Sequence, residues 1–510
     1  MRFLSKIRER QFAKKWGGAY NLSKAVLAGV LAAGCLMPGF AEAAALLVPH
    51  PVDSITVVPT EGENTATITA VDGDVDEIVI YWASNNGRVE GCTINVDNII
   101  IEPKINIYGG RTFNNVAVTG NKVTIKDTTF KKTTYIRGGY SAGGAANKNS
   151  VSISGGTFNN SNSAVYGGNG ATAANGNSVI ISDSTIYGKV YGGYGGEEAS
   201  FNSVIISGGT FNNIYGGLAT SISGEANGNS VIISGGNING LICGGDGYTA
   251  EGNSVEINGG TINAEVSGGF SQYGKANNNK VSISGGEFYY NVHGGYASSG
   301  TAEGNSVEIN GGTITGEVYG GYASSGTAEG NSVEINGGTI KKNVFGGYSN
   351  SGNANKNSVS ISGGTLNGDV RVWGGWADSN SGNADGNSVS ISGGTFNDSV
   401  RVWGGLSQSG TANKNSVIIS GGKFYNDFYG GKGETAADDN RVIISGGTIN
   451  SYVYGGYSES GTANRNQVII SDGTINSYVY GGSSRTEAKY NKIVLLGNNA
   501  NYTFTNAHVR

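Results

Sequence analysis

The stretch YASSGTAEGNSVEINGGTI occupies residues 296–314 and returns letter for letter at residues 322–340, 26 residues further along the chain. Its segment NSVEI is one case of a pattern in which Asn is followed by an aliphatic residue two positions on and another four positions on. The fifteen copies begin at Asn 121, 149, 177, 202, 229, 253, 279, 305, 331, 357, 387, 415, 440, 466 and 491. Such a period indicates stacked structural repeats rather than a duplicated functional site.

Each repeat contains strand signals and turn signals but no helical pattern. The alternation of apolar and polar residues in NSVEI is typical of a strand with one buried face. NGG or SGG then marks a turn, TI or TF makes a second short strand, and segments such as EVYGG make a third. Three short strands in about 26 residues predict one coil of a parallel β-helix, so the sequence indicates an all-β fold of about fifteen coils.

The repeated positions have structural explanations. The aliphatic residues should form the core, and the Asn side chains should stack at a turn between neighbouring coils. All five prolines, Pro38, Pro49, Pro51, Pro59 and Pro103, precede residue 104, and a proline would remove a hydrogen bond from a stacked strand. We therefore predict a repetitive array over 105–510 and irregular first coils, or a cap, over 44–104.

The first 43 residues have the composition of a secretory signal peptide. A basic segment is followed by the apolar run AVLAGVLAAGCLMPGF and the small-residue motif AEA at Ala41–Ala43. Removing residues 1–43, with their seven basic and two acidic residues, changes the formal charge from −5 to −10. That charge argues against nucleic acid as a partner.

The sequence offers little for catalysis or for cofactors. Cys92 and Cys243 are 151 residues apart, about six coils, which is too far for a disulfide, so we expect two free thiols. His50 and His293 have no zinc-ligand spacing, and the acids of GYGGEE (193–198) and ADDN (437–440) suit solvated loops. We expect no cofactor, no metal and no enzymatic activity.

One row of outward residues lies between the two core aliphatics of each first strand. It contains two aliphatic clusters, Ile180, Ile205 and Ile232, and Ile418, Ile443 and Ile469. An exposed apolar patch indicates a contact surface, although a covering loop or a strand buried on both faces would explain it equally. Between the clusters, Glu308 and Glu334 occupy adjacent coils, where their repulsion would weaken stacking or be relieved by a bound cation.

A second row precedes each Gly-Gly pair and is aromatic in the C-terminal half of the array. Its members are Tyr319, Phe345, Trp373, Trp403, Tyr429, Tyr454 and Tyr480. If the preceding aliphatic residue points inward, these rings point outward and form a ladder. Stacked rings stabilise the coil in their own right, and a row of flat rings also suits sugar faces or apolar partners. Arg371 and Arg401 share this face and suit acidic groups.

The repeated NxVxISGGT…VYGG units, over about residues 105–497, resemble the adhesin-like passenger domains of bacterial autotransporters. The resemblance implies a right-handed β-helix, export by the Sec route, and display at the outer membrane or release from a diderm bacterium. It also implies a translocator β-barrel, which we do not find in this sequence, so the chain is either a truncated product or the substrate of separate machinery.

We therefore expect a non-catalytic cell-surface or secreted stalk or adhesin with a role in virulence. Its partners would be glycans or proteins of host or neighbouring cells, or a second copy of the chain. The alternative is a polysaccharide lyase or hydrolase on the same fold, which would need several acids, or Arg and Lys, on one strand face.

Overall fold

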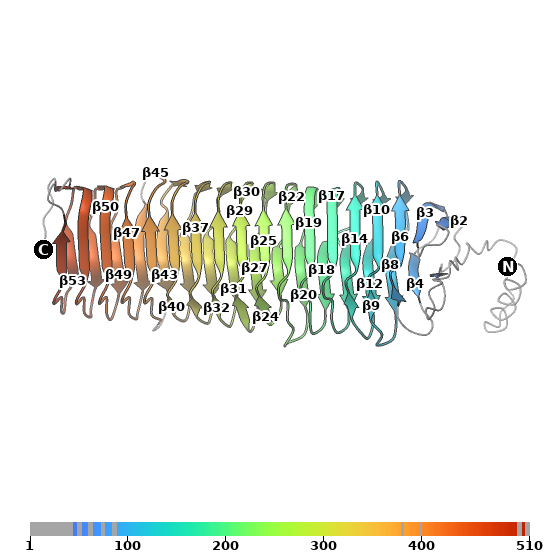
Figure 1. Ribbon diagram of the computed structural model, residues 1–510, viewed down its shortest axis with the longest axis horizontal. Coiled ribbons are helices and arrows are strands. Elements are labelled where there is room, and N and C mark those ends of the chain that lie inside the picture. The colour runs from blue at the N-terminus through green and yellow to red at the C-terminus, as the bar shows by residue number, and fades with distance from the viewer. Residues whose placement is uncertain are drawn as a thin grey trace, which may run out of the picture.

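The computed structural model describes strands β1 (Ala44–Leu47), β2 (Ser54–Pro59), β3 (Thr65–Asp72) and β4 (Glu77–Ala83), then residues 89–378, 382–397, 400–496 and 502–504. Across these ranges the chain is all-β without a helix, and parallel strands stack into a β-solenoid of about 16 turns spaced about 26 residues apart. Figure 1 shows the turns side by side along one elongated rod. The predicted fold class is confirmed, while the signal peptide over 1–43 lies outside the described residues.

One coil shows how the repeat folds. Residues around 300–323 form β32 (Ala302–Glu303), β33 (Ser306–Ile309), β34 (Thr313–Ile314) and β35 (Val318–Ala323). The last three are the three predicted strands, and β32 adds a two-residue strand before the repeated Asn. β33 and β34 join a 30-stranded sheet, and β35 joins a 17-stranded sheet.

The other coils repeat this arrangement. Third strands are β4, β8 (Lys104–Thr112), β12 (Thr134–Ser141), β16 (Ala164–Gly170), β18 (Lys189–Gly195), β20 (Ile214–Ala219), β23 (Ile242–Asp246), β27 (Val266–Ser271), β31 (Val292–Ala297), β35, β39 (Val344–Ser349), β43 (Arg371–Ala377), β46 (Arg401–Ser407), β49 (Phe428–Gly433), β51 (Val453–Ser458) and β53 (Val479–Ser484). First strands are β6 (Thr93–Asp97), β10 (Lys122–Lys126), β14 (Ser150–Ser154), β17 (Ser178–Ile186), β19 (Ser203–Phe211), β21 (Ser230–Ile233), β25 (Ser254–Ile257), β29 (Lys280–Ile283), β33, β37 (Ser332–Ile335), β41 (Ser358–Ile361), β44 (Ser388–Ile391), β47 (Ser416–Ile419), β50 (Arg441–Ile449), β52 (Gln467–Ile475) and β54 (Lys492–Leu495).

The core is a column of aliphatic side chains inside the coils. In the coil of β33–β35, Val307, Ile309, Ile314 and Val318 are all buried. Each stacks in register on its equivalent in the next coil, as Val307 does on Val333. Full burial of one such side chain contributes about 1.5–3 kcal/mol relative to exposure. Because one coil has no second layer to cover this surface, the column is stable only as a stack.

The repeated Asn residues form a buried hydrogen-bonded ladder. The backbone N and the side-chain Nδ2 of Asn305 both donate to Oδ1 of Asn331, at 2.9 Å each. Asn331 donates in the same way to Asn357, at 2.9 and 3.0 Å. The same bonds link every repeated Asn from Asn121 to Asn491, which confirms the predicted stack.

The Gly-Gly pair after each third-strand aromatic residue allows two close approaches. A Cβ on Gly320 would lie 2.3 Å from the carbonyl oxygen of Gly346 in the next coil. A Cβ on Gly321 would lie 2.2 Å from Cγ of Asn331, so the second glycine makes room for the Asn ladder. These contacts explain why the pair is repeated in coil after coil.

An additional turn precedes the first repeated Asn. β6 pairs in register with β10, so Ile94 stacks on Val123 and Val96 on Ile125. Cys92 occupies the Asn position of this turn, and its backbone N donates to Oδ1 of Asn121 at 3.0 Å. The repeat pattern does not detect this turn, because the pattern requires an Asn at the position that Cys92 occupies. Before it, β1 pairs antiparallel with β4, and β2 with β3.

Candidate functional surfaces

The aromatic residues before Gly-Gly form a continuous stack, which we call the inner row. Ring centroids are 4.6 Å apart for Tyr319 and Phe345, 4.7 Å for Phe345 and Trp373, and 5.1 Å for Trp373 and Trp403. The row continues through Tyr429, Tyr454 and Tyr480. The parallel register of β35, β39, β43 and β46 brings these rings together, because equivalent residues of adjacent coils pair directly.

Much of the inner row is not exposed. The inner-row members from Tyr319 to Trp403 are buried, and Trp373 is only 1% exposed. They pack beneath Tyr322, Tyr348, Trp376 and Leu406. The ladder is present, but outer side chains cover Tyr319, Phe345, Trp373 and Trp403, whereas Tyr429, Tyr454 and Tyr480 are partly exposed.

The covering residues form an outer row that the sequence reasoning did not identify. They directly follow each Gly-Gly pair, a position that could have been recognised from the motif YGGY. Tyr322 stacks on Tyr296 at 4.8 Å and on Tyr348 at 5.1 Å, and these rings are partly exposed. A partner that touches this face would meet the outer row first. Whether either row binds a ligand stays a prediction.

The buried phenols of the inner row carry no charge at neutral pH. Burial, and then the hydrogen bond that Tyr319 donates to Glu317, raise the pKa of Tyr319 far above its usual range. Burial likewise raises the pKa of Tyr215 to about 12. The phenols therefore stay protonated at neutral pH and act as hydrogen-bond donors rather than anions.

Arg371 and Arg401 lie beside the inner row and share one acid. Asp369 is 4.0 Å from Nη2 of Arg371 and 3.9 Å from Nη1 of Arg401. Both arginine side chains are about 40% exposed, so these contacts are weak surface pairs. The arrangement leaves both guanidinium groups accessible, with the single carboxylate of Asp369 between them.

The isoleucine clusters lie on the outer face of the 30-stranded sheet. Register pairs Ile180 with Ile205 and Ile205 with Ile232 in one cluster. In the other, Ile418 pairs with Ile443 and Ile443 with Ile469. The exposed fraction is 47% for Ile180 and 38% for Ile418. Partly exposed members are Ile205, Ile232 and Ile443, whereas Ile469 is buried. The apolar patches therefore reach solvent, and Ile469 lies below the surface of its cluster.

Glu308 and Glu334 pair directly in the register of β33 and β37. The repulsion is reduced on one side, because Nζ of Lys280 lies 2.7 Å from Glu308. The hydrogen bond from Lys280, followed by that from Asn310, lowers the pKa of Glu308. The ammonium group of a lysine in the preceding coil thus offsets part of the repulsion between Glu308 and Glu334.

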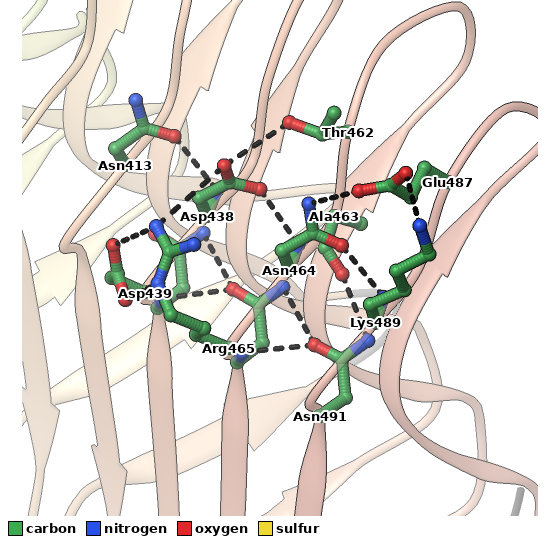
Figure 2. A network of polar contacts seen from close by, with 12 residues as sticks. Asn413, Asp438, Asp439, Thr462, Ala463, Asn464, Arg465, Glu487, Lys489 and Asn491 are labelled. Atoms are coloured by element: carbon green, nitrogen blue, oxygen red, sulfur yellow. Dashed lines mark hydrogen bonds and ion pairs between the residues drawn. The ribbon is translucent and has the colours of Figure 1, made fainter.

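The acids near residue 438 belong to a structural network. Figure 2 shows Asp438 accepting a hydrogen bond from the backbone N of Asn464, at 2.6 Å, and Arg465 bridging to Asp439, at 2.8 and 2.7 Å. The hydrogen bond from Arg465 lowers the pKa of Asp439. The oxygens of these carboxylates already accept hydrogen bonds from other residues of the chain. The two acids therefore link the loops of neighbouring coils.

The inner row is interrupted by Cys243, Ser267 and His293. Burial lowers the pKa of His293 to about 3, and its ring stacks on Tyr319 at 4.9 Å. Burial raises the pKa of Cys243 and, to about 6, that of Asp246. No disulfide joins Cys92 to Cys243, as predicted.

Neither a metal group nor a membrane helix occurs in the part of the chain that the structure describes. No three His, Cys, Asp or Glu side chains gather there as metal ligands. No helix of the length and apolarity needed to cross a bilayer is found among those residues. Comparison with protein-family models, curated proteins and solved structures gave no match for this chain.

Proposed function

We propose that the chain is a non-catalytic, exported β-solenoid adhesin, displayed on or released from a diderm bacterium, which acts by associating with a second copy of itself. The observation that carries the proposal is the pair of isoleucine clusters on the outer face of the 30-stranded sheet. The resemblance of its repeats to autotransporter passengers supports the extracellular setting.

The two clusters are placed symmetrically along the rod. Three coils carry the first cluster, the six coils of Glu256, Ser282, Glu308, Glu334, Ser360 and Ser390 follow, and three coils carry the second. The midpoint falls between Glu308 and Glu334. A second copy packed face to face in the antiparallel direction would place Ile205 opposite the partner's Ile443.

The surroundings of the clusters favour a flat partner. Ile205 is flanked by Ser203 and Ser207 on the same strand, so small side chains border the apolar row. Two flat β-faces of this kind pack closely, as sheets in dry interfaces do. Five of the six isoleucines keep exposed surface, and the further burial of each contributes on the order of 1 kcal/mol, whereas Ile469 is already buried and adds little. After the entropy cost of association, we expect a weak dimer.

Charge favours the antiparallel over the parallel arrangement. Parallel pairing would place Glu256, Glu308 and Glu334 each opposite its own copy. Antiparallel pairing places Glu256 opposite Ser390 and leaves two like-charge contacts in place of three, Glu308 opposite Glu334 and its symmetric equivalent. In each of them Glu308 already has Lys280 as a partner. Fewer like charges then meet at the interface.

A charge pair tests both the surface and the orientation. Ile205→Lys alone and Ile443→Glu alone should each abolish dimerisation in sedimentation equilibrium, because each buries an unpaired charge. The double variant should recover it, since the new Lys and Glu face each other only in the antiparallel dimer. A double variant that stays monomeric would exclude this arrangement.

Milder variants control for folding. Ser occupies the equivalent position in other coils, as at Ser282 and Ser360, so Ile205→Ser should fold normally and still weaken association. Ile222, 88% exposed in a loop, gives the matched control, and Ile222→Ser should leave association unchanged. Release of reducing ends or unsaturated products from pectin-like or host glycans would instead favour the enzyme alternative.

A further inference from the structure

Two arginines near the N-terminal end of the rod occupy positions that are mostly aromatic elsewhere. Arg111 lies on β8 in the outer row, and Arg137 lies on β12 in the inner row. Their guanidinium carbons are 4.6 and 5.0 Å from the ring centroid of Tyr108, and 5.8 and 5.4 Å from that of Tyr140. Two cations therefore share the same two rings.

Neither cation is neutralised by a carboxylate among the residues that the structure describes. Nε of Arg111 and both Nε and Nη1 of Arg137 are buried without a hydrogen-bond partner. Over the described ranges no carboxylate forms an ion pair with either residue, whereas Arg371 and Arg465 each have one. Unsatisfied buried donors are costly, more so when charged, and two like charges close together add repulsion. An anion at the accessible edges of the two guanidinium groups would relieve the repulsion and offset part of the cost of burying their charge.

The rings hold the guanidinium groups in place for such an anion. The guanidinium of Arg137 also lies 5.0 Å from the rings of Tyr135 and Tyr166, so cation–π contacts surround its inner side. Both arginine side chains remain partly exposed, which leaves their outer edges accessible. Because the rings already restrict these long side chains, binding an anion would cost little further conformational entropy.

The chemistry around the pair indicates the ligand class. Phe113 is 63% exposed, and its ring centroid lies 4.2 Å from the guanidinium carbon of Arg111. Flat apolar rings beside guanidinium groups suit a pyranose ring that carries a carboxylate or sulfate. An extended peptide would need free backbone groups, but those of β8 and β12 are paired within the sheet.

We propose that Arg111 and Arg137, with Tyr108, Tyr140 and Phe113, form a binding site for an anionic sugar unit of an acidic polysaccharide. The site lies far along the rod from Glu308 and Glu334, whose charges would repel such a polymer. The inference does not rest on self-association, because the isoleucine variants leave these residues unchanged.

Calorimetric titration of the full chain with polyanions tests the site. The probes are polygalacturonate, which carries carboxylates, heparin, which adds sulfates, methyl-esterified pectin as the neutral match, and polyglutamate as an acidic peptide. We expect binding of one or both acidic polysaccharides, no binding of the esterified polymer, and weaker binding at higher salt.

Matched arginine variants locate the site. Arg111→Gln with Arg137→Gln should weaken polyanion binding by at least about tenfold, the loss expected when charge-assisted hydrogen bonds are removed. Arg371→Gln with Arg401→Gln should change it by less than about threefold, since that pair lies on distant coils and has the carboxylate of Asp369 beside it. If the first pair fails to fold, Arg111→Lys with Arg137→Lys keeps the charges and should still weaken binding, because the planar donor fork is lost.

Three outcomes would overturn the proposal. The wild-type chain binds neither acidic polysaccharide at low salt, polyglutamate binds as tightly as the glycans, or both arginine pairs have equal effects. A ligand-induced rise in melting temperature that is present in the wild type and absent in the first pair would support it independently.

Discussion

Truncation of one ladder asparagine should destabilise the rod far more than truncation of a surface asparagine in the same coil. Asn331 takes part in four side-chain hydrogen bonds. Its Oδ1 accepts from N and Nδ2 of Asn305, and its Nδ2 donates to Asn357 at 3.0 Å and to the carbonyl of Ala302 at 2.8 Å. All four bonds are buried, so water does not replace them readily.

The magnitude follows from what Asn331→Ala leaves behind. The buried backbone N–H of Asn305 loses its acceptor, whereas its side chain keeps a bond to Ala276 at 2.7 Å. One orphaned buried donor costs about 1–3 kcal/mol, and the broken ladder and the vacated space raise the total to about 3–5 kcal/mol. Asn336 is exposed and bonds only to surface side chains, so Asn336→Ala should cost less than about 1 kcal/mol.

The variant Asn331→Asp distinguishes the effect of lost hydrogen bonds from the effect of lost side-chain volume, because Asp and Asn have nearly the same size. Its second carboxylate oxygen would face the two acceptors that Nδ2 now contacts, and burial would raise the pKa of the new acid. A folded-state pKa above the unfolded value means that stability falls as pH rises from about 4 to the folded pKa. The variant should therefore be weakest at neutral pH and should partly recover in acid.

Amide hydrogen exchange measured by mass spectrometry gives the local readout. Peptides from residues 302–335 should lose protection in Asn331→Ala, while peptides from residues 440–470 serve as the internal reference. Guanidinium melts of the two alanine variants give the free-energy difference. Equal stabilities for Asn331→Ala and Asn336→Ala, or a penalty for Asn331→Asp that is the same at pH 4 and pH 7, would refute the reasoning.

Three further perturbations test other parts of the coil. Gly320→Ala should destabilise by several kcal/mol in thermal melts, because its Cβ would overlap the carbonyl of Gly346, while Gly330→Ala should cost only about 1 kcal/mol for its φ of 66°. Trp373→Ala should cost about 3–5 kcal/mol in the same assay, as large buried aromatic residues do. Burial lowers the pKa of His293 to about 3, so its contribution to stability is present above pH 6.5 and is lost as pH falls toward 3. The variant His293→Phe should remove that dependence from acid melts.

The interior of the solenoid was predictable because it depends on identity at fixed positions. Val307, Ile309 and Asn305 occupy equivalent places in every repeat, so period and alternation were sufficient to assign the core and the ladder. The turn of Cys92 lies within 44–104, where irregular first coils or a cap were expected, and it meets the ladder through its backbone N–H. A residue without a side-chain amide satisfies that bond as well as Asn does, and an Asn-based pattern excludes it.

Burial of the inner row was not predictable from strand alternation. Tyr319 and Tyr322 are three positions apart, which would place them on opposite faces of a regular strand. In the structure their rings contact edge to face at 5.2 Å. The pairing of β35 with β39 passes from Tyr319 to Gly321 without a partner for Gly320, so the strand departs from regular alternation at the glycine pair. Alternation rules do not include this change of direction.

The stretch that occurs at residues 296–314 and again at 322–340 indicates which coils of the rod can give specific binding. Its inward residues and its Asn make their contacts with neighbouring coils. Its outward Glu308 forms an ion pair with Lys280. A coil that matches its neighbours at every outward position presents a uniform surface. Distinct surfaces arise only where coils depart from the repeat, as at the isoleucine clusters and at Arg111 and Arg137. Replacing these residues by those that the repeat has at the same positions should therefore abolish recognition by this chain and leave the core intact.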